Sequence, residues 1–116
     1  MKYSLFIGRW QPFHDGHRWL INERLKEGKN VCIAVRETDK SDSNPYNPKD
    51  VKKKIEEDLK ELIDAKKVKV IIIPDIESVN YGRGVGYEII EHFPPRTIMN
   101  ISATEIRQKL RESGKL

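Results

Sequence analysis

The sequence contains very little cysteine and no long apolar run. Cys32 is the only cysteine, so an internal disulfide is excluded. No apolar run approaches the roughly 18 residues that a membrane span requires. The first residues do not resemble a secretory signal either. We therefore expect a cytoplasmic protein without a membrane partner.

What the chain has in abundance is charge. Its 116 residues are 37% hydrophobic and 34% charged. A chain of this length can bury roughly two-thirds of its unfolded surface, which is enough for one sheet with flanking helices. No repeat or linker interrupts it. We expect a single domain over residues 1–116.

The net charge of +4 suits an anionic partner, which composition alone leaves as either a nucleotide or a nucleic acid. The densest basic run, residues 52–54, is followed at i,i+4 spacing by Glu56, Glu57 and Asp58. This spacing indicates a solvated helix face. A nucleic-acid partner is therefore not expected.

Apolar runs typical of strands alternate with segments of helical periodicity. Strands are predicted over residues 3–7, 31–35, 68–73 and 97–101. Helices are predicted after Gly16, from Pro48 to Ile63, over residues 87–93 and from Ser102 onward. With right-handed crossovers, this succession predicts an α/β fold with a parallel, doubly wound, Rossmann-like sheet in the strand order 3-2-1-4. The first and last strands are then neighbours, which brings the loop of His14 and His17 beside the helix start at Ser102.

The sequence GRWQPFHDGH, which starts at Gly8, follows the first strand directly and opens a helix. In open α/β sheets, ligands bind at the carboxyl ends of the strands. Gly8 permits a close approach of a ligand to the backbone, and the helix that begins near Gly16 directs unpaired N–H groups into the same crevice. Because His14, His17 and Arg9 stand at this rim, the segment suits a polyphosphate.

This sequence resembles the GRxQPFHxGH signature of the nucleotidyltransferase superfamily, and in particular of archaeal-type nicotinamide mononucleotide adenylyltransferases. A second element agrees with it. Residues 101–107, ISATEIR, resemble the ISxTxIR box of the same family, which opens the last helix and grips the triphosphate. The two motifs occur in the right order near opposite ends of the chain. The resemblance implies the family's Rossmann-like, HUP-type fold.

The resemblance also implies roles for individual residues. The residues expected to be catalytic are His14, His17 and Arg107. The residues expected to bind the nucleotide and its phosphates are Gly8, Arg9, Trp10, Phe13, Gly16, Ser102, Ala103 and Thr104. The residues expected to contact the acceptor or the base are Gln11, Asn44, Tyr46, Lys49, Tyr81 and Arg83. Mg²⁺ is expected as a cofactor bound through the nucleotide phosphates, with no metal site made of protein ligands.

The reaction implied by the resemblance transfers a nucleoside monophosphate from a nucleoside triphosphate to a phosphorylated small molecule and releases pyrophosphate. AMP is slightly favoured as the transferred group. Phosphate oxygens are mostly ionised at neutral pH, so no general base is required. The protein must instead supply cationic or N–H stabilisation and alignment of two anions. Because the core is small, we also expect self-association as a homodimer.

Two features depart from the adenylyltransferase pattern. The family typically has an arginine around the position of Val51, so Lys49 or Lys52 would have to substitute for it. Between Pro74 and Ile101 the family usually fits an extra strand, whereas this chain has room for a loop and a short helix. Compact cytidylyltransferases, which act on polyol or sugar phosphates, are nearer this size. The sequence therefore leaves open which nucleotide base and which acceptor the protein uses.

Other interpretations of the same residues stay open too. Trp10 and Phe13 can pack under the loop instead of lining a pocket, and Arg83 can be an ordinary surface arginine. For the whole chain, the alternatives are a nucleotide-binding module without turnover and an RNA-binding module related to synthetases. Pyrophosphate release separates an enzyme from the first alternative, and steep salt dependence of tRNA binding would indicate the second.

Overall fold

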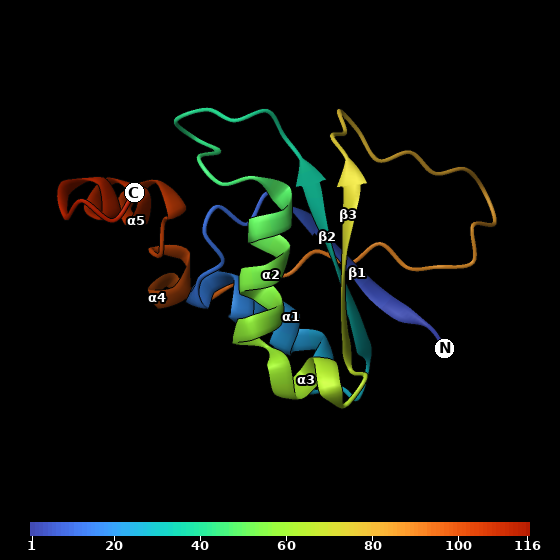
Figure 1. Ribbon diagram of the computed structural model, residues 1–116. Helices are drawn as coiled ribbons and strands as arrows, with labels where there is room; N and C mark the ends of the chain where they lie inside the picture. The colour runs from blue at the N-terminus through green and yellow to red at the C-terminus, as the bar shows by residue number, and fades with distance from the viewer.

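Three parallel strands form the single sheet of the protein (Figure 1). The computed structural model describes residues 1–116. The strands β1 (Tyr3–Gly8), β2 (Asn30–Glu37) and β3 (Val68–Pro74) lie in the order β1-β2-β3. All three coincide with predicted strands, and their order matches the 3-2-1 part of the prediction. Because β2 lies between two neighbours, its run Val31–Val35 is apolar and buried at every position.

The helices that connect the strands lie on one face of the sheet. Helix α1 (Asp15–Leu25) connects β1 to β2, and helices α2 (Pro48–Asp58) and α3 (Lys60–Asp64) connect β2 to β3. Both connections advance in the same direction across the sheet, so right-handed crossovers place their helices on the same side. Figure 1 shows α1, α2 and α3 grouped on that side. None of the helices has the length and apolar character that a membrane crossing requires.

The hydrophobic core fills the space between these helices and the sheet. Val31, Ile33 and Val35 alternate along β2 and are 0% exposed. They belong to one cluster with Ile21 of α1 and Ile55 of α2. Burying side chains of this size stabilises the fold by about 1.5–3 kcal/mol each. The core therefore fixes the ends of β1 and β2, from which the loops of the candidate site leave.

The predicted fourth strand over residues 97–101 is wrong. Residues Arg96–Met99 form the short helix α4, in which the amides of Ile98 and Met99 both donate to the carbonyl of Pro95 at 2.9 Å. Pro95 is the N-cap of α4, and its backbone is extended while its carbonyl already accepts the bonds of the first turn. With no strand on the free edge of β1, the sheet is not doubly wound and the order 3-2-1-4 does not form.

Two predicted helices also differ from the structure. The segment of residues 75–95 contains no helix, so the helix predicted over residues 87–93 is wrong. A helix of seven residues is too short to persist without a surface to pack on. The helix predicted from Pro48 to Ile63 is interrupted at Leu59, where φ is −113° and ψ is 26°. The last helix, α5 (Ala103–Glu112), follows its prediction.

Candidate active site

Trp10 and Gln11 hold down the loop after β1. The Trp10 indole nitrogen Nε1 donates to the Ala34 carbonyl of β2 at 3.0 Å. The Gln11 side chain donates to the Tyr46 carbonyl at 2.9 Å and accepts from the Tyr46 amide at 3.0 Å. Trp10 has a φ of 54°, a conformation that costs about 1–3 kcal/mol in a non-glycine residue. A Cβ on Gly8 would lie 2.9 Å from the indole, so this tight packing requires glycine there.

These contacts give three predicted site residues a structural role in the loop. Trp10, Gln11 and Phe13 are 5%, 3% and 7% exposed, and both aromatic residues belong to the core cluster. Both polar ends of the Gln11 amide are used on Tyr46. The geometry therefore favours the interpretation in which Trp10 and Phe13 pack under the loop.

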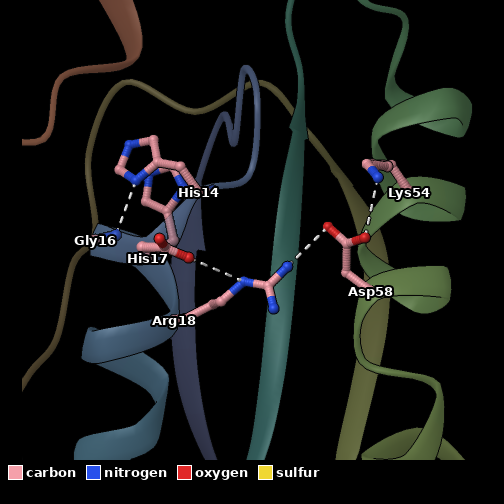
Figure 2. Close-up of polar contacts among 7 residues, drawn as sticks. His14, Gly16, His17, Arg18, Lys54 and Asp58 are labelled. Carbon is pink, nitrogen blue, oxygen red and sulfur yellow. Dashed lines mark hydrogen bonds and ion pairs between the residues drawn. The ribbon is translucent and has the colours of Figure 1, made fainter. Parts of the chain in front are cut away.

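His14 and His17 stand together at the start of α1 (Figure 2). Their rings stack with centroids 3.7 Å apart and planes inclined by 18°. The Nδ1 atom of His14 accepts from the Gly16 amide at 3.0 Å, and Nδ1 of His17 accepts from the His14 amide at 3.2 Å. A ring nitrogen that accepts carries no proton, so each neutral imidazole carries its proton on Nε2. Both histidines thus keep an Nε2–H donor for an anion.

Burial keeps both imidazoles neutral. It lowers the pKa of His17 to about 3, and the neighbouring His14 adds to this shift. Burial also lowers the pKa of His14, although the charge of Asp15 opposes the change. His17 lies edge-on to Trp10 and stacks near Phe13, with centroid distances of 4.7 and 5.6 Å. At neutral pH the pair therefore offers hydrogen-bond donors without positive charge.

The second motif lies directly against the first. A Cβ on Gly16 would lie 3.8 Å from the Cβ of Ile101, and α4 packs against α1. The same Cβ would lie 2.8 Å from Cε1 of His14, so glycine leaves the space that the ring occupies. The residues that open α5 directly after Ile101 are Ser102, Ala103 and Thr104. The predicted neighbourhood of the two motifs is therefore present, even though no fourth strand forms.

Arg107 joins the two motifs by a hydrogen bond. Its guanidinium donates to the Gln11 carbonyl at 2.6 Å and to Oγ1 of Thr104 at 3.3 Å. The residue is 6% exposed. Ser102 caps α5, because its Oγ accepts from the Glu105 amide at 3.4 Å. The start of α5 is thereby fixed beside the loop that follows β1.

Three arginines, which we call the arginine cluster, gather at this junction: Arg9, Arg107 and Arg111. Burial lowers the pKa of Arg107, and the nearby charges of Arg9 and Arg111 lower it further. No carboxylate forms an ion pair with any of the three. Arg111 also donates to the carbonyl of Asp42, in the loop after β2. Guanidinium groups without acidic partners are suited to binding phosphate oxygens.

Neither motif points to Arg111, and the sequence predictions do not include it. It follows Arg107 by four residues, so both side chains lie on one face of α5. This i,i+4 spacing is the signal that could have identified it.

The loop after β2 is connected to the site through Tyr46. Its backbone is held by Gln11, and the Tyr46 ring packs against the core. Asn44 donates its side-chain amide to Oγ of Ser41 at 3.2 Å. The Asn44 oxygen Oδ1 is buried without a hydrogen-bond partner. An unsatisfied buried acceptor is unusual in a protein. Asn44 therefore stays a candidate for a contact with the acceptor substrate or the nucleotide base.

The other predicted acceptor or base contacts are not brought to the two motifs by any hydrogen bond or ion pair. Lys49 is exposed in the first turn of α2. Tyr81 is 66% exposed, and Arg83 is also exposed, within residues 75–95. Their side chains extend into solvent.

Arg18 connects α1 to α2 next to the histidine pair (Figure 2). It forms an ion pair with Asp58 at 3.1 Å, and Lys54 contacts the same carboxylate at 3.0 Å. Lys52 pairs with Glu56 at 3.7 Å. The basic run of α2 is therefore a solvated helix face that pairs with its own acidic residues, as predicted.

Comparisons with known proteins agree with the two motifs. No family model matches the chain. The nicotinamide-nucleotide adenylyltransferase of Methanococcus aeolicus is 44% identical over 45 residues, which cover 37% of this chain and 26% of the relative. The enzyme of that name from Methanolobus tindarius is 40% identical over 48 residues, or 41% of this chain and 27% of the relative.

A third relative aligns with nearly the whole chain. The nicotinamide-nucleotide adenylyltransferase of Pyrobaculum neutrophilum is 29% identical over 117 residues, which cover 98% of this chain and 64% of the relative. The chain thus spans about a quarter of the first two relatives and less than two-thirds of the third. The comparisons confirm the resemblance that the motifs carry, which is to the nucleotidyltransferase superfamily and, within it, to archaeal nicotinamide-nucleotide adenylyltransferases.

Proposed function

We propose that this protein is an adenylyltransferase, which transfers AMP from ATP to a phosphorylated small molecule and releases pyrophosphate. The observation that carries the proposal is the hydrogen bond from Arg107 to Gln11, which joins the HxGH loop to the start of α5. At that junction the neutral donors of His14 and His17 are combined with the arginine cluster. The names of the relatives make nicotinamide mononucleotide the first acceptor to test.

The reaction needs placement and charge stabilisation more than proton transfer. An oxygen of the acceptor phosphate attacks the α-phosphorus of ATP, and a new P–O bond forms. The bond from the α-phosphorus to the bridging oxygen breaks, and pyrophosphate leaves with its electron pair. Both phosphates are ionised at neutral pH, so no base is required. Negative charge grows on the leaving oxygen and must be stabilised.

Each part of the candidate site has a distinct role in this proposal. The Nε2–H groups of His14 and His17 donate to phosphate oxygens in the transition state. Because the pKa of His17 is about 3, this residue acts as a neutral donor and not as a general acid. Arg107 and Arg111 bind the β- and γ-phosphates, and Arg9 assists them. Fixed donors of this kind cost no reorganisation during the reaction.

Mg²⁺ enters this proposal as part of the nucleotide substrate. No group of three His, Cys, Asp or Glu side chains converges in the structure. Mg²⁺ prefers oxygen ligands and is commonly bound by substrate phosphates and water together with few protein groups. When bound, the ion neutralises part of the triphosphate charge. The arginine cluster would compensate the charge that remains.

The decisive experiment measures pyrophosphate release with ATP or CTP, each combined with nicotinamide mononucleotide or a polyol phosphate. We expect release with ATP and a phosphorylated acceptor, and a loss of about 10²–10³-fold in kcat in His17→Ala. The matched control is His92→Ala, because His92 lies outside both motifs. Pyrophosphate release with CTP and an acceptor, but not with ATP, would mean that the protein is a cytidylyltransferase and not an adenylyltransferase. Nucleotide binding without release under any combination would indicate a non-catalytic module.

A further inference from the structure

Gln11 is bonded to two other segments of the chain at once. Its side-chain amide donates to the Tyr46 carbonyl at 2.9 Å and accepts from the Tyr46 amide at 3.0 Å. Its backbone carbonyl accepts from the guanidinium of Arg107 at 2.6 Å. Gln11 is only 3% exposed. Because both polar atoms of this buried side chain have protein partners, Gln11 is placed to hold segments together and not to bind a ligand.

The loop after β2 has few other attachments to the protein. Two backbone hydrogen bonds of 3.1 Å close a turn within it. From residue 41 to residue 46, its hydrogen bonds to other segments are the two with Gln11 and one from Arg111. Asn44, the candidate substrate contact of this loop, stands two residues before Tyr46. The position of Asn44 therefore depends on the bonds between Gln11 and the Tyr46 backbone.

Tyr46 also lies beside Arg107. Burial lowers the pKa of Arg107, as do the charges of Arg9 and Arg111. The Tyr46 phenol partly opposes this lowering of the pKa, as a group close to the guanidinium does. Gln11, Tyr46 and Arg107 are thus mutual neighbours, although they come from three distant parts of the sequence. A displacement of one of them disturbs the other two.

Alignment is what the proposed reaction demands of these segments. In that reaction the histidine pair and Arg107 hold the nucleotide phosphates, while the loop after β2 offers a contact to the acceptor or the base. A misplacement of about 1 Å between reacting groups can cost about 10²-fold in rate. Gln11 stands three residues before His14 and is bonded to the Tyr46 backbone. It therefore sets the distance between the two parts of the candidate site.

We propose that Gln11 is a positioning residue, which holds the loop after β2 at a fixed distance from the histidine pair through the Tyr46 backbone. It touches no substrate, in contrast to the contact that the sequence predicted for it. The inference rests on the proposed function and deepens it. Gln11 acts on the alignment of bound substrates and hence on kcat, because the groups that bind each substrate stay on their own segments.

Substitutions at Gln11 separate alignment from binding. Gln11→Met keeps the length of the side chain and removes both bonds to Tyr46. We expect kcat for pyrophosphate release to fall at least about tenfold, with the KM of each substrate changed less than about twofold. Gln11→Glu keeps an acceptor for the Tyr46 amide and loses the donor to the carbonyl, and it should show the same split between kcat and KM. The matched control is Gln108→Met, an identical change at an exposed position bonded to Glu112, which should leave both constants unchanged.

Two kinetic outcomes would overturn the proposal. A higher KM for one substrate at unchanged kcat in Gln11→Met would make Gln11 a direct substrate contact. A lower melting temperature with unchanged kcat and KM would give Gln11 a role in stability alone.

Hydrogen exchange tests the attachment of the loop without any turnover. In the wild-type chain the Tyr46 amide should exchange at least about tenfold more slowly than in an unstructured peptide, and Gln11→Met should remove this protection. Exchange of the Tyr46 amide at the unstructured rate in the wild type would overturn the proposal. A protected Tyr46 amide in a wild-type protein that releases no pyrophosphate would contradict the proposed function while supporting the attachment of the loop to Gln11.

Discussion

The guanidinium of Arg107 donates to the backbone carbonyl of Gln11 across 96 residues of sequence, at 2.6 Å. This bond joins helix α5 to the loop after β1, and it lies where the two sequence motifs meet. Arg107 is buried and charged, and no carboxylate pairs with it. The positive charge is therefore available to an anionic ligand while the geometry is held by a neutral carbonyl.

Replacing Arg107 tests both of these roles. Arg107→Ala removes a charged donor from a buried carbonyl, so we expect the free energy of unfolding to fall by about 1.5–3 kcal/mol in urea titrations. Calorimetry should also show weaker ATP binding. Arg107→Lys retains the charge but not the planar fork, so it should recover part of the affinity. ATP affinity that is unchanged in Arg107→Ala would remove this residue from the nucleotide site.

Arg111 provides a test of the cluster that leaves this bond intact. Its side chain is exposed and contacts the loop after β2 only through the Asp42 carbonyl. Arg111→Ala should raise the KM for ATP several-fold and change stability by less than about 0.5 kcal/mol. Lys109→Ala, on the same helix, is the matched control for the loss of one positive charge. If both variants raise KM equally, the effect comes from net charge and not from the cluster.

A substitution at Gly16 tests whether the position of the His14 ring matters for catalysis. Gly16→Ala introduces a Cβ 2.8 Å from Cε1 of this ring, so the imidazole must move and its Nε2–H donor is misplaced. We expect kcat to fall at least tenfold, with helix content preserved in circular dichroism because alanine favours helices. Gly82→Ala is the control, since nothing lies within 4 Å of that position. Full activity of Gly16→Ala would mean that the ring position is not critical.

Protonation of His17 links stability to pH. Its pKa is about 3 in the folded protein and about 6.5 in the unfolded chain, so the unfolded chain binds more protons between these values. The free energy of unfolding should therefore be constant above about pH 6.5 and decrease as the pH falls towards 3. Thermal melts across this range measure the slope. His17→Asn should flatten it, and an identical slope in that variant would assign the acid sensitivity to other groups.

Local patterns were sufficient to predict most of the core. The apolar run of β2 and the helical periodicity from Pro48 depend on neighbours a few residues away. The strand formed where the sequence predicted it, and the helix formed as predicted up to its interruption at Leu59. The strand prediction over residues 97–101 was wrong because a strand depends on a partner that lies far away in the sequence. A strand needs a partner, and at this position the Pro95 carbonyl accepts two amides from the following turn instead.

By itself, the sequence determined the chemical groups of this protein and the order in which they occur. A glycine-flanked histidine loop follows an apolar strand, and a serine-capped helix that contains Arg107 follows near the C-terminal end. Only the tertiary structure decided that Trp10 and Gln11 are buried, that Arg111 joins Arg9 and Arg107, and that α1, α2 and α3 lie on one face of the sheet. The physical reason is range: helical and strand periodicity are local, whereas burial and the pairing of charges depend on residues that lie far apart in the chain.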